Sequence, residues 1–259
     1  MLAGPMPPPE MGANGTCLCV EPHPPFSHPA RPPQCFFFDL GLNVGDSTVA
    51  FFDLNHNDPH FPHFPCIFHK ASSYVGACTK TATAARQILG DVTLPALRER
   101  GLEPRDCHVV GVEMLGKYSS PLSAVAANLS SAGRSVEFLL ERAATTCEAN
   151  LSYSLSKFAT DGLLPAAGLG RAKHRVRSVN VLRLLMERTQ PQDFVVMKMD
   201  LEGHEYHLIP CLASSRRART LIDQLFVEEH GLMNWAEYYK LENAYKVLRP
   251  HMLINTRWP

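Results

Sequence analysis

Acidic side chains, joined by one histidine, follow apolar stretches at four separate places in this chain of 259 residues. The stretches 36–38, 108–112, 194–199 and 225–227 are short, nearly continuous and rich in aromatic or β-branched residues, as in strands buried in a parallel sheet. Parallel strands end at one edge of a sheet, so we predict that the polar groups behind them meet along one rim. These groups are Asp39, Glu113, Asp200, Glu202, Glu205, Glu228, Glu229 and His230. Carboxylates and an imidazole gathered there could take a proton from a substrate or bind a divalent cation.

A tight turn is predicted immediately behind the first of these strands. Residues 39–48 read D-L-G-L-N-V-G-D-S-T, and the glycines let the chain turn sharply because they carry no Cβ penalty at positive φ. Such a turn between a strand and a helix allows the backbone to approach a nucleotide-like ligand closely. The spacing differs from the G-x-G-x-x-G of dinucleotide-binding folds. D-x-G-x-x-x-G resembles instead the pattern that methyltransferases using S-adenosylmethionine (SAM) place after their first strand.

The stretch 194–206, F-V-V-M-K-M-D-L-E-G-H-E-Y, places two charged residues on a strand. Lys198 and Asp200 lie on the same face because strand side chains alternate, and burying them costs free energy unless they pair or face a crevice. We expect Lys198 to pair with an acid. Asp200 is the first candidate for a catalytic base or a metal ligand, and His230 follows it as a candidate base. Glu229 is a further candidate for either role.

Four motifs, in order along the chain, resemble the FkbM-type family of SAM-dependent methyltransferases: D-L-G-x-N-x-G-D-S-T, G-V-E, K-M-D-x-E-G-x-E-Y and I-D-x-L-x-V-E-x-H. They span about residues 36–230, and the third is the family's most specific element. The resemblance implies a class I methyltransferase fold, which is an α/β, Rossmann-like architecture with a mostly parallel sheet of seven strands and helices on both faces. It also implies SAM as the cofactor and methyl transfer to a hydroxyl oxygen, so the expected partner is a small-molecule or glycan acceptor.

The resemblance also assigns roles to individual residues. The SAM loop would be formed by Asp39, Gly41, Asn43, Gly45 and Ser47. Glu113 would hold the ribose, and Ala143 would line the adenine region. Asp200 would lie beside the methionine moiety and the substrate.

Two other classes of protein remain open from the sequence. A nicotinamide-dependent oxidoreductase would also use a glycine turn and a ribose-binding acid, although no G-x-G-x-x-G follows the first strand. A binding protein that keeps the SAM fold without catalysis is suggested by the short segment behind the fifth strand. Only residues 252–258 are available there for a final antiparallel hairpin, so the sheet could be abbreviated at its C-terminal end.

A single domain is predicted at 35–259, with a tail before it and an insertion within it. Residues 1–34 are rich in proline and are predicted to form a disordered tail. Residues 53–75 are predicted to form an insertion rich in proline and histidine. We favour a surface or substrate-facing insertion over a metal site, because nothing fixes ligand geometry in so proline-broken a stretch. Apolar spacing predicts helices at 81–89, 94–100, 121–129 and 179–188.

The composition excludes some functions. The 25 basic and 25 acidic residues balance, so no basic surface for nucleic acid is predicted. No apolar run approaches the ~20 residues that a membrane span requires and no secretory leader is evident, which favours a cytoplasmic location.

The eight cysteines are scattered and do not demand a disulfide framework; Cys17 and Cys19 lie in the predicted tail. N-x-S/T triplets begin at Asn14, Asn128 and Asn150, and without a leader they receive little weight.

Overall fold

The computed structural model describes residues 17–19, 21–22, 29–43, 45–54, 75–148, 150–154, 164–165, 174–230 and 235–258. Most of the predicted insertion at 53–75, with the histidines at 56, 60, 63 and 69, lies outside these residues. Much of the predicted tail lies outside them as well.

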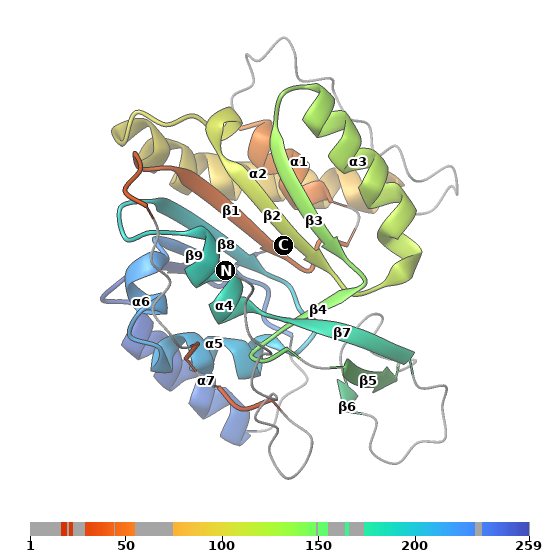
Figure 1. Ribbon diagram of the computed structural model, residues 1–259, viewed down its shortest axis with the longest axis vertical. Coiled ribbons are helices and arrows are strands. Elements are labelled where there is room, and N and C mark those ends of the chain that lie inside the picture. Colours follow the sequence, from red (N-terminus) through yellow and green to blue (C-terminus); the bar gives the residue numbers. More distant parts are fainter. Residues whose placement is uncertain are drawn as a thin grey trace.

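A six-stranded sheet forms the centre of the fold (Figure 1). Its strands are β1 (Cys35–Leu40), β2 (His108–Glu113), β3 (Ser135–Leu140), β8 (Phe194–Met199), β9 (Gln224–Val227) and β10 (Leu253–Asn255). They are ordered β10-β9-β8-β1-β2-β3, and every pairing between neighbours is parallel. The prediction of an α/β protein with a mostly parallel central sheet is therefore confirmed, and the arrangement is consistent with a Rossmann-like fold.

Helices cover both faces of this sheet. The helices are α1 (Asp46–Phe52), α2 (Val75–Glu99), α3 (Ser119–Ser131), α4 (Val181–Arg188), α5 (Glu205–Ser214), α6 (Ala218–Leu221) and α7 (Trp235–Leu248). Side chains of β1 alternate between two cores: Phe37 packs with α1, α2 and α3, whereas Phe38 packs with α4, α5 and α7. Burial on both faces explains why the central strands read as continuous apolar runs.

Two predictions about individual elements are corrected by the structure. The helices predicted at 81–89 and 94–100 are one helix, α2, which continues through Pro95. The antiparallel hairpin expected from 252–258 does not form in the described residues, because β10 pairs parallel with β9. Helix α7 lies between these two strands in the chain and returns it to the starting edge, so β10 runs in the same direction as β9.

A second, four-stranded sheet forms beside the central one from β4 (Arg142–Thr145), β5 (Asn150–Ser154), β6 (Leu164–Pro165) and β7 (His174–Asn180). Its order is β4-β7-β5-β6, and Figure 1 shows it below the C-terminal end of β3. The sequence showed no strong signal between residues 148 and 175, so this sheet was not predicted. It matters for the site because β4 follows β3 directly and carries Ala143.

Three disulfide bonds join distant parts of the described chain. They are Cys17–Cys147, Cys19–Cys211 and Cys35–Cys107, with sequence separations of 130, 192 and 72 residues. The sequence did not demand a disulfide framework, and the structure nevertheless pairs six of the cysteines. Scattered cysteines carry no spacing signal, because only the fold brings them together.

The described residues of the predicted tail are also attached to the domain. Arg31 forms two hydrogen bonds to the carboxylate of Asp193, at 2.7 and 2.5 Å, and the N–H of Gln34 donates to the same carboxylate at 2.9 Å. Residues 29–34 are thus ordered, because the buried carboxylate of Asp193 binds them. The proline-rich composition did not reveal this partner.

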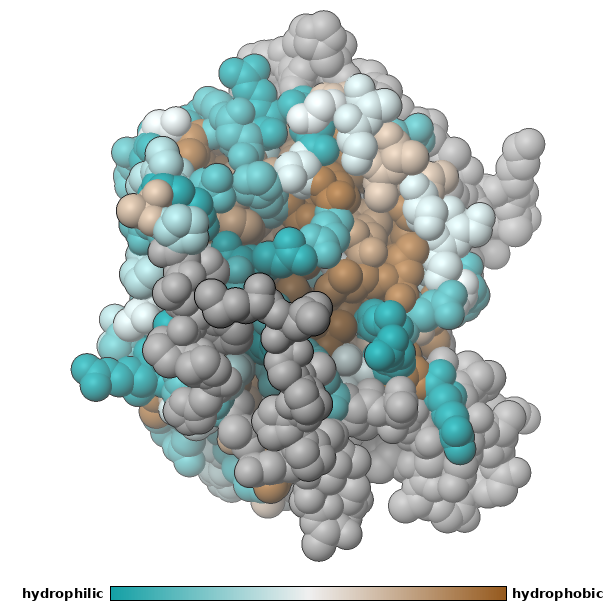
Figure 2. Space-filling model, viewed as in Figure 1, coloured by the Kyte–Doolittle hydropathy of each residue, from teal (hydrophilic) through white to brown (hydrophobic). Residues whose placement is uncertain are grey.

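The edge of the central sheet at β3 is only half-buried. Figure 2 shows apolar surface over the region of β2 and β3.

None of the helices in the described ranges combines the length and the hydropathy that crossing a bilayer requires.

Candidate functional site

The order of the strands reverses between β1 and β8. From β1 the chain proceeds outward through β2 and β3, and from β8 it proceeds in the other direction through β9 and β10. In open parallel sheets, ligands bind in the crevice outside the carboxyl ends of the strands at such a reversal. The turn behind β1 and the residues behind β8 therefore lie where the fold itself favours a ligand site.

The turn behind β1 is fastened to both neighbouring strands. The N–H groups of Gly41 and Leu42 donate to the carbonyl of Val112 at 3.0 and 3.2 Å. Gly41 has φ +85°, and a Cβ added to it would lie 1.8 Å from the carbonyl oxygen of Asp200. Glycine is required here by both the positive φ and the close approach of the chain behind β8.

The substitution Gly41→Ala is expected to destabilise the protein more than Gly133→Ala. Both positions have positive φ, so both substitutions carry a cost of about 1–2 kcal/mol. A Cβ on Gly133 meets nothing within 4 Å, whereas on Gly41 it must displace the Asp200 backbone. Urea unfolding should show a further loss of about 1 kcal/mol or more for Gly41→Ala. Equal losses would contradict the close packing of this turn.

A cleft opens beside this turn. It is lined by Gly41, Asn43, Val112, Glu113, Met114, Leu115, Tyr118, Arg142, Ala143, Ala144, Asp200, Leu201 and Glu202. Of the predicted cofactor-binding residues, Gly41, Asn43, Glu113 and Ala143 are among them, and so is the first catalytic candidate, Asp200. Segments behind β1, β2, β3 and β8 thus meet in one cleft.

Glu113 is placed in the cleft wall and also holds the wall together. Its Oε2 accepts a hydrogen bond from the N–H of Asn43 at 2.8 Å, and its Oε1 accepts one from the N–H of Leu115 at 2.7 Å. Glu113 therefore joins the turns behind β1 and β2 whether or not a ligand is present.

Three predicted cofactor-binding residues, Asp39, Gly45 and Ser47, are not part of the cleft lining. The carboxylate of Asp39 is fully buried and accepts hydrogen bonds from the hydroxyls of Ser47 and Thr48, at 2.6 and 2.7 Å. It anchors the start of α1 to the end of β1. These residues shape the turn and do not face the cleft, because Asp39 still lies within the strand and points into the core.

Lys198 is buried between the two strand ends. Its Nζ lies 3.4 Å from Asp39 Oδ1 and 3.3 Å from Asp200 Oδ2, and it donates to the carbonyl of Gly41 at 2.6 Å. Burial acts to lower the pKa of Lys198, but Asp200, Asp39 and Asp46 outweigh it and raise that pKa above its usual value. The expectation that Lys198 pairs with an acid is confirmed.

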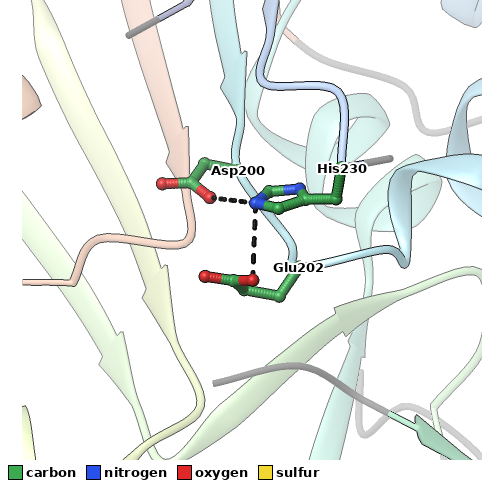
Figure 3. A group of neighbouring side chains, drawn as sticks. All are labelled: Asp200, Glu202 and His230. Carbon is green, nitrogen blue, oxygen red and sulfur yellow. Dashed lines mark ion pairs between the residues drawn. The ribbon is translucent and has the colours of Figure 1, made fainter. Parts of the chain in front are cut away.

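The Nε2 of His230, behind β9, faces three carboxylates. It lies 3.7 Å from Asp200 Oδ1, 3.4 Å from Glu202 Oε2 and 3.7 Å from Glu228 Oε1. Figure 3 shows the imidazole edge directed at Asp200 and Glu202, which both line the cleft. The predicted candidate Glu229 is exposed and belongs to none of the ion pairs around His230. Glu228, and not Glu229, approaches His230, because side chains alternate at the end of the strand.

Glu205 and Tyr206, the first residues of α5, hold His230 in place. Glu205 is completely buried; it lies 3.0 Å from His230 Nδ1 and accepts the N–H of Gly203 at 2.9 Å. The hydroxyl of Tyr206 donates to the carbonyl of His230. With Nδ1 held by a carboxylate, the orientation of the ring is set and Nε2 faces the cleft residues.

The neighbouring carboxylates shift the pKa values of His230 and Glu228. Burial acts to lower the pKa of His230, but its hydrogen bond to Glu205 and the charges of Glu205, Glu202 and Asp200 raise it to about 9. Burial and the charge of Asp200 raise the pKa of Glu228 to about 7. Strongly perturbed titratable groups next to a cleft are a common property of functional sites.

The stability of the protein should depend on the protonation of His230. Its pKa of about 9 exceeds the ordinary value of 6.5, so the folded chain binds the proton more tightly than the unfolded chain. This contribution is complete below about pH 6.5 and is lost as the pH rises through about 9. We expect the stability advantage of the wild type over His230→Gln to shrink across this range, in urea unfolding with EDTA present. A constant difference would contradict the described pairing.

The same side chains could hold a divalent cation. Asp200, Glu202 and His230 each offer one ligand atom, and these atoms all lie within 4.8 Å of one another. Mixed imidazole and carboxylate ligands suit zinc and other transition metals. A carboxylate on the second ring nitrogen, here Glu205, is the usual outer partner of a metal-binding histidine. The donor set of these residues thus fits a cation, with Glu202 in place of the predicted Glu229.

Several residues of the cleft were not predicted, notably Tyr118 and Arg142. Tyr118 ends a short 3₁₀ helix (Gly116–Tyr118) behind β2, and Arg142 begins β4. Neither belongs to a motif with fixed spacing, so no sequence signal could have identified them.

Comparison of this chain with protein-family models, with curated proteins and with solved structures finds no match. The function is therefore inferred from the fold and from the geometry of the cleft.

Proposed function

We propose that this chain is a SAM-dependent methyltransferase of the class I fold, related to the FkbM type, which methylates a hydroxyl of a sugar or small metabolite. One observation carries the proposal: Asp200 lines the same cleft as the glycine turn, Glu113 and Ala143. A group able to accept a proton and a turn suited to a nucleoside thus share one ligand site. The D-x-G-x-x-x-G and K-x-D-x-E-G-x-E motifs supply the residues on its two sides.

The cleft residues suit the parts of SAM in turn. The carboxylate of Glu113 lines the cleft and suits the ribose hydroxyls, and the small side chains of Ala143 and Ala144, with the ring of Tyr118, suit a flat adenine. Gly41 brings the turn behind β1 close against the backbone of Asp200. When bound, SAM supplies a methyl group on a sulfonium, which an attacking oxygen takes by in-line displacement.

The chain itself must orient the acceptor and remove its proton. Orientation of two reactants supplies much of the catalysis in such a displacement. A hydroxyl is a weak nucleophile at neutral pH, so a base is needed. Asp200 and Glu202 both line the cleft next to His230, and Asp200 also lies against the glycine turn behind β1. We assign Asp200 as the proton acceptor and His230 as the residue that positions it and balances its charge.

Ligand binding tests the cofactor. SAM or S-adenosylhomocysteine should raise the melting temperature by several degrees at concentrations of about 100 Kd, and NAD(H) should not. Tyr118→Ala should weaken this binding, whereas Tyr239→Ala, at an exposed position on α7, should leave it unchanged. A response to NAD(H) alone would favour the nicotinamide oxidoreductase instead.

Methyl transfer from labelled SAM to a panel of sugars and small alcohols tests the reaction. Transfer to a hydroxyl supports the proposal. Tight binding of S-adenosylhomocysteine without transfer to any acceptor would favour a catalytically inactive binding protein.

A divalent cation is a second component of the proposal. Asp200, Glu202 and His230 would hold it, and it would supply Lewis-acid polarisation of the acceptor hydroxyl. Calorimetric titration of Mn²⁺ or Zn²⁺ into EDTA-treated protein measures this without an assay of activity. Glu202→Gln should weaken binding about 10-fold or more, and Glu187→Gln, at an exposed ion pair with Arg183, should not. If the wild type bound neither cation, Asp200 would act as the base without a metal.

A further inference from the structure

The disulfide bonds hold together segments that are far apart in the sequence. Cys17 and Cys19, two residues apart, are bonded to Cys147, in the segment after β4, and to Cys211 in α5, respectively. Cys35, the first residue of β1, is bonded to Cys107, which directly precedes β2. The first two bonds fix the N-terminal segment across the domain, and the third joins two neighbouring central strands.

A set of structural disulfides indicates an oxidising environment. Each bond forms when two thiols give up two electrons and two protons to an oxidant, which in the secretory pathway is a disulfide-carrying oxidoreductase. The cytosol keeps thiols reduced, so bonds of this kind persist in the lumen of the secretory pathway or outside the cell. This evidence is independent of the cleft and of its proposed chemistry.

One N-x-S/T triplet has an accessible asparagine in the described structure. Asn128 and Ser130 are exposed on α3, whereas Leu129 between them is buried against the sheet. In the described part of the chain, the amide side chain of Asn128 makes no hydrogen bond. The asparagines of the other two triplets, Asn14 and Asn150, lie where the structure does not describe side chains.

We propose that the chain matures in an oxidising compartment of the secretory pathway and carries an N-linked glycan on Asn128. The amide nitrogen of Asn128 forms a bond to the anomeric carbon of a lipid-linked oligosaccharide. The bond from that carbon to the lipid diphosphate breaks, the diphosphate leaves with the electron pair, and the amide releases a proton. This location replaces the cytoplasmic one that the sequence favoured.

The folded structure has room for such a glycan. Asn128 lies ten residues along the helical direction from Tyr118 at the cleft, which corresponds to about 15 Å. The buried side of α3 is formed by Leu122, Val125 and Leu129, so a bulky group on Asn128 meets solvent and not the core. The glycan would leave the cleft open.

Site occupancy tests the glycan. The full chain, secreted from a eukaryotic host, should lose mass on treatment with peptide N-glycosidase, and peptide mapping should find Asn128 converted to aspartate. Ser130→Ala should abolish this modification, because it removes the triplet. Ser131→Ala, its exposed neighbour, should retain it. An unmodified Asn128 in the secreted wild type would overturn the proposal for this site.

The redox state tests the compartment. Peptide mapping without reductant, on protein prepared in the absence of thiols, should recover the three cross-linked pairs. Reduction should lower the melting temperature by about 5–10 °C or more. Recovery of these cysteines as free thiols, or a melting temperature insensitive to reduction, would overturn the proposed location while leaving the cleft and its ligand untouched.

Discussion

Asp200→Asn is expected to lower the rate of methyl transfer by a factor of about 10²–10⁴, which is the usual contribution of a positioned base. The amide keeps the shape of the side chain but cannot accept the proton of the acceptor hydroxyl. Binding of S-adenosylhomocysteine should remain, because the other cleft residues are unchanged. The measurement combines single-turnover transfer from labelled SAM with calorimetric titration of the product.

Two variants make this result specific. Asp106→Asn, at a carboxylate whose side chain is 58% exposed, should retain full activity and stability. His230→Gln should reduce the rate and also change its dependence on pH, as expected for a positioning residue. If Asp200→Asn kept the wild-type rate while the protein bound cofactor, the assignment of Asp200 as the base would be wrong.

Lys198→Met is expected to destabilise the protein by about 3–5 kcal/mol, the cost of leaving a buried ion pair with one partner missing. The Lys198 side chain is 3% exposed, and its ammonium group lies between Asp39 and Asp200. Without it, the buried carboxylate of Asp39 and the cleft carboxylate of Asp200 lose the cation between them, and the carbonyl of Gly41 loses its donor. Equilibrium unfolding in urea measures the loss.

A matched variant separates this effect from the loss of any lysine. Lys240→Met, on the exposed side of α7, should change the free energy of unfolding by less than about 0.5 kcal/mol. The double variant Lys198→Met/Asp200→Asn should recover part of the loss, because it removes one of the two unpaired charges. Equal losses for Lys198→Met and Lys240→Met would contradict the buried network. This prediction does not depend on the proposed function.

The central strands could be predicted because burial on both faces imposes one simple pattern. Continuous apolar runs ending in Asp39, Glu113 and the segment behind Met199 follow directly from a parallel sheet covered by helices. The second sheet has no such pattern. β4 and β6 contain only four and two residues, and exposed arginines alternate with buried side chains in β7, so contacts with neighbouring strands, and not a continuous apolar run, determine them.

The role of a residue at the rim was less predictable than its presence there. Asp39 belongs to the D-x-G-x-x-x-G motif, yet its carboxylate turns inward to Ser47, Thr48 and Lys198. Glu228 and Glu229 are adjacent in the chain, and only Glu228 approaches His230. Side-chain direction at a strand end depends on which backbone positions still belong to the strand, and the sequence does not specify that boundary.

The sequence alone determined a parallel α/β sheet, a glycine turn behind its first strand, and acids at the ends of the strands. These depend on local properties: burial pattern, backbone freedom at Gly41, and charge placed next to apolar runs. The tertiary structure alone decided which of those residues share a cleft, that Glu205 orients His230, and that Cys17, Cys19 and Cys35 have partners. Each of these is a contact between residues far apart in the chain, so it exists only once the strands are placed side by side.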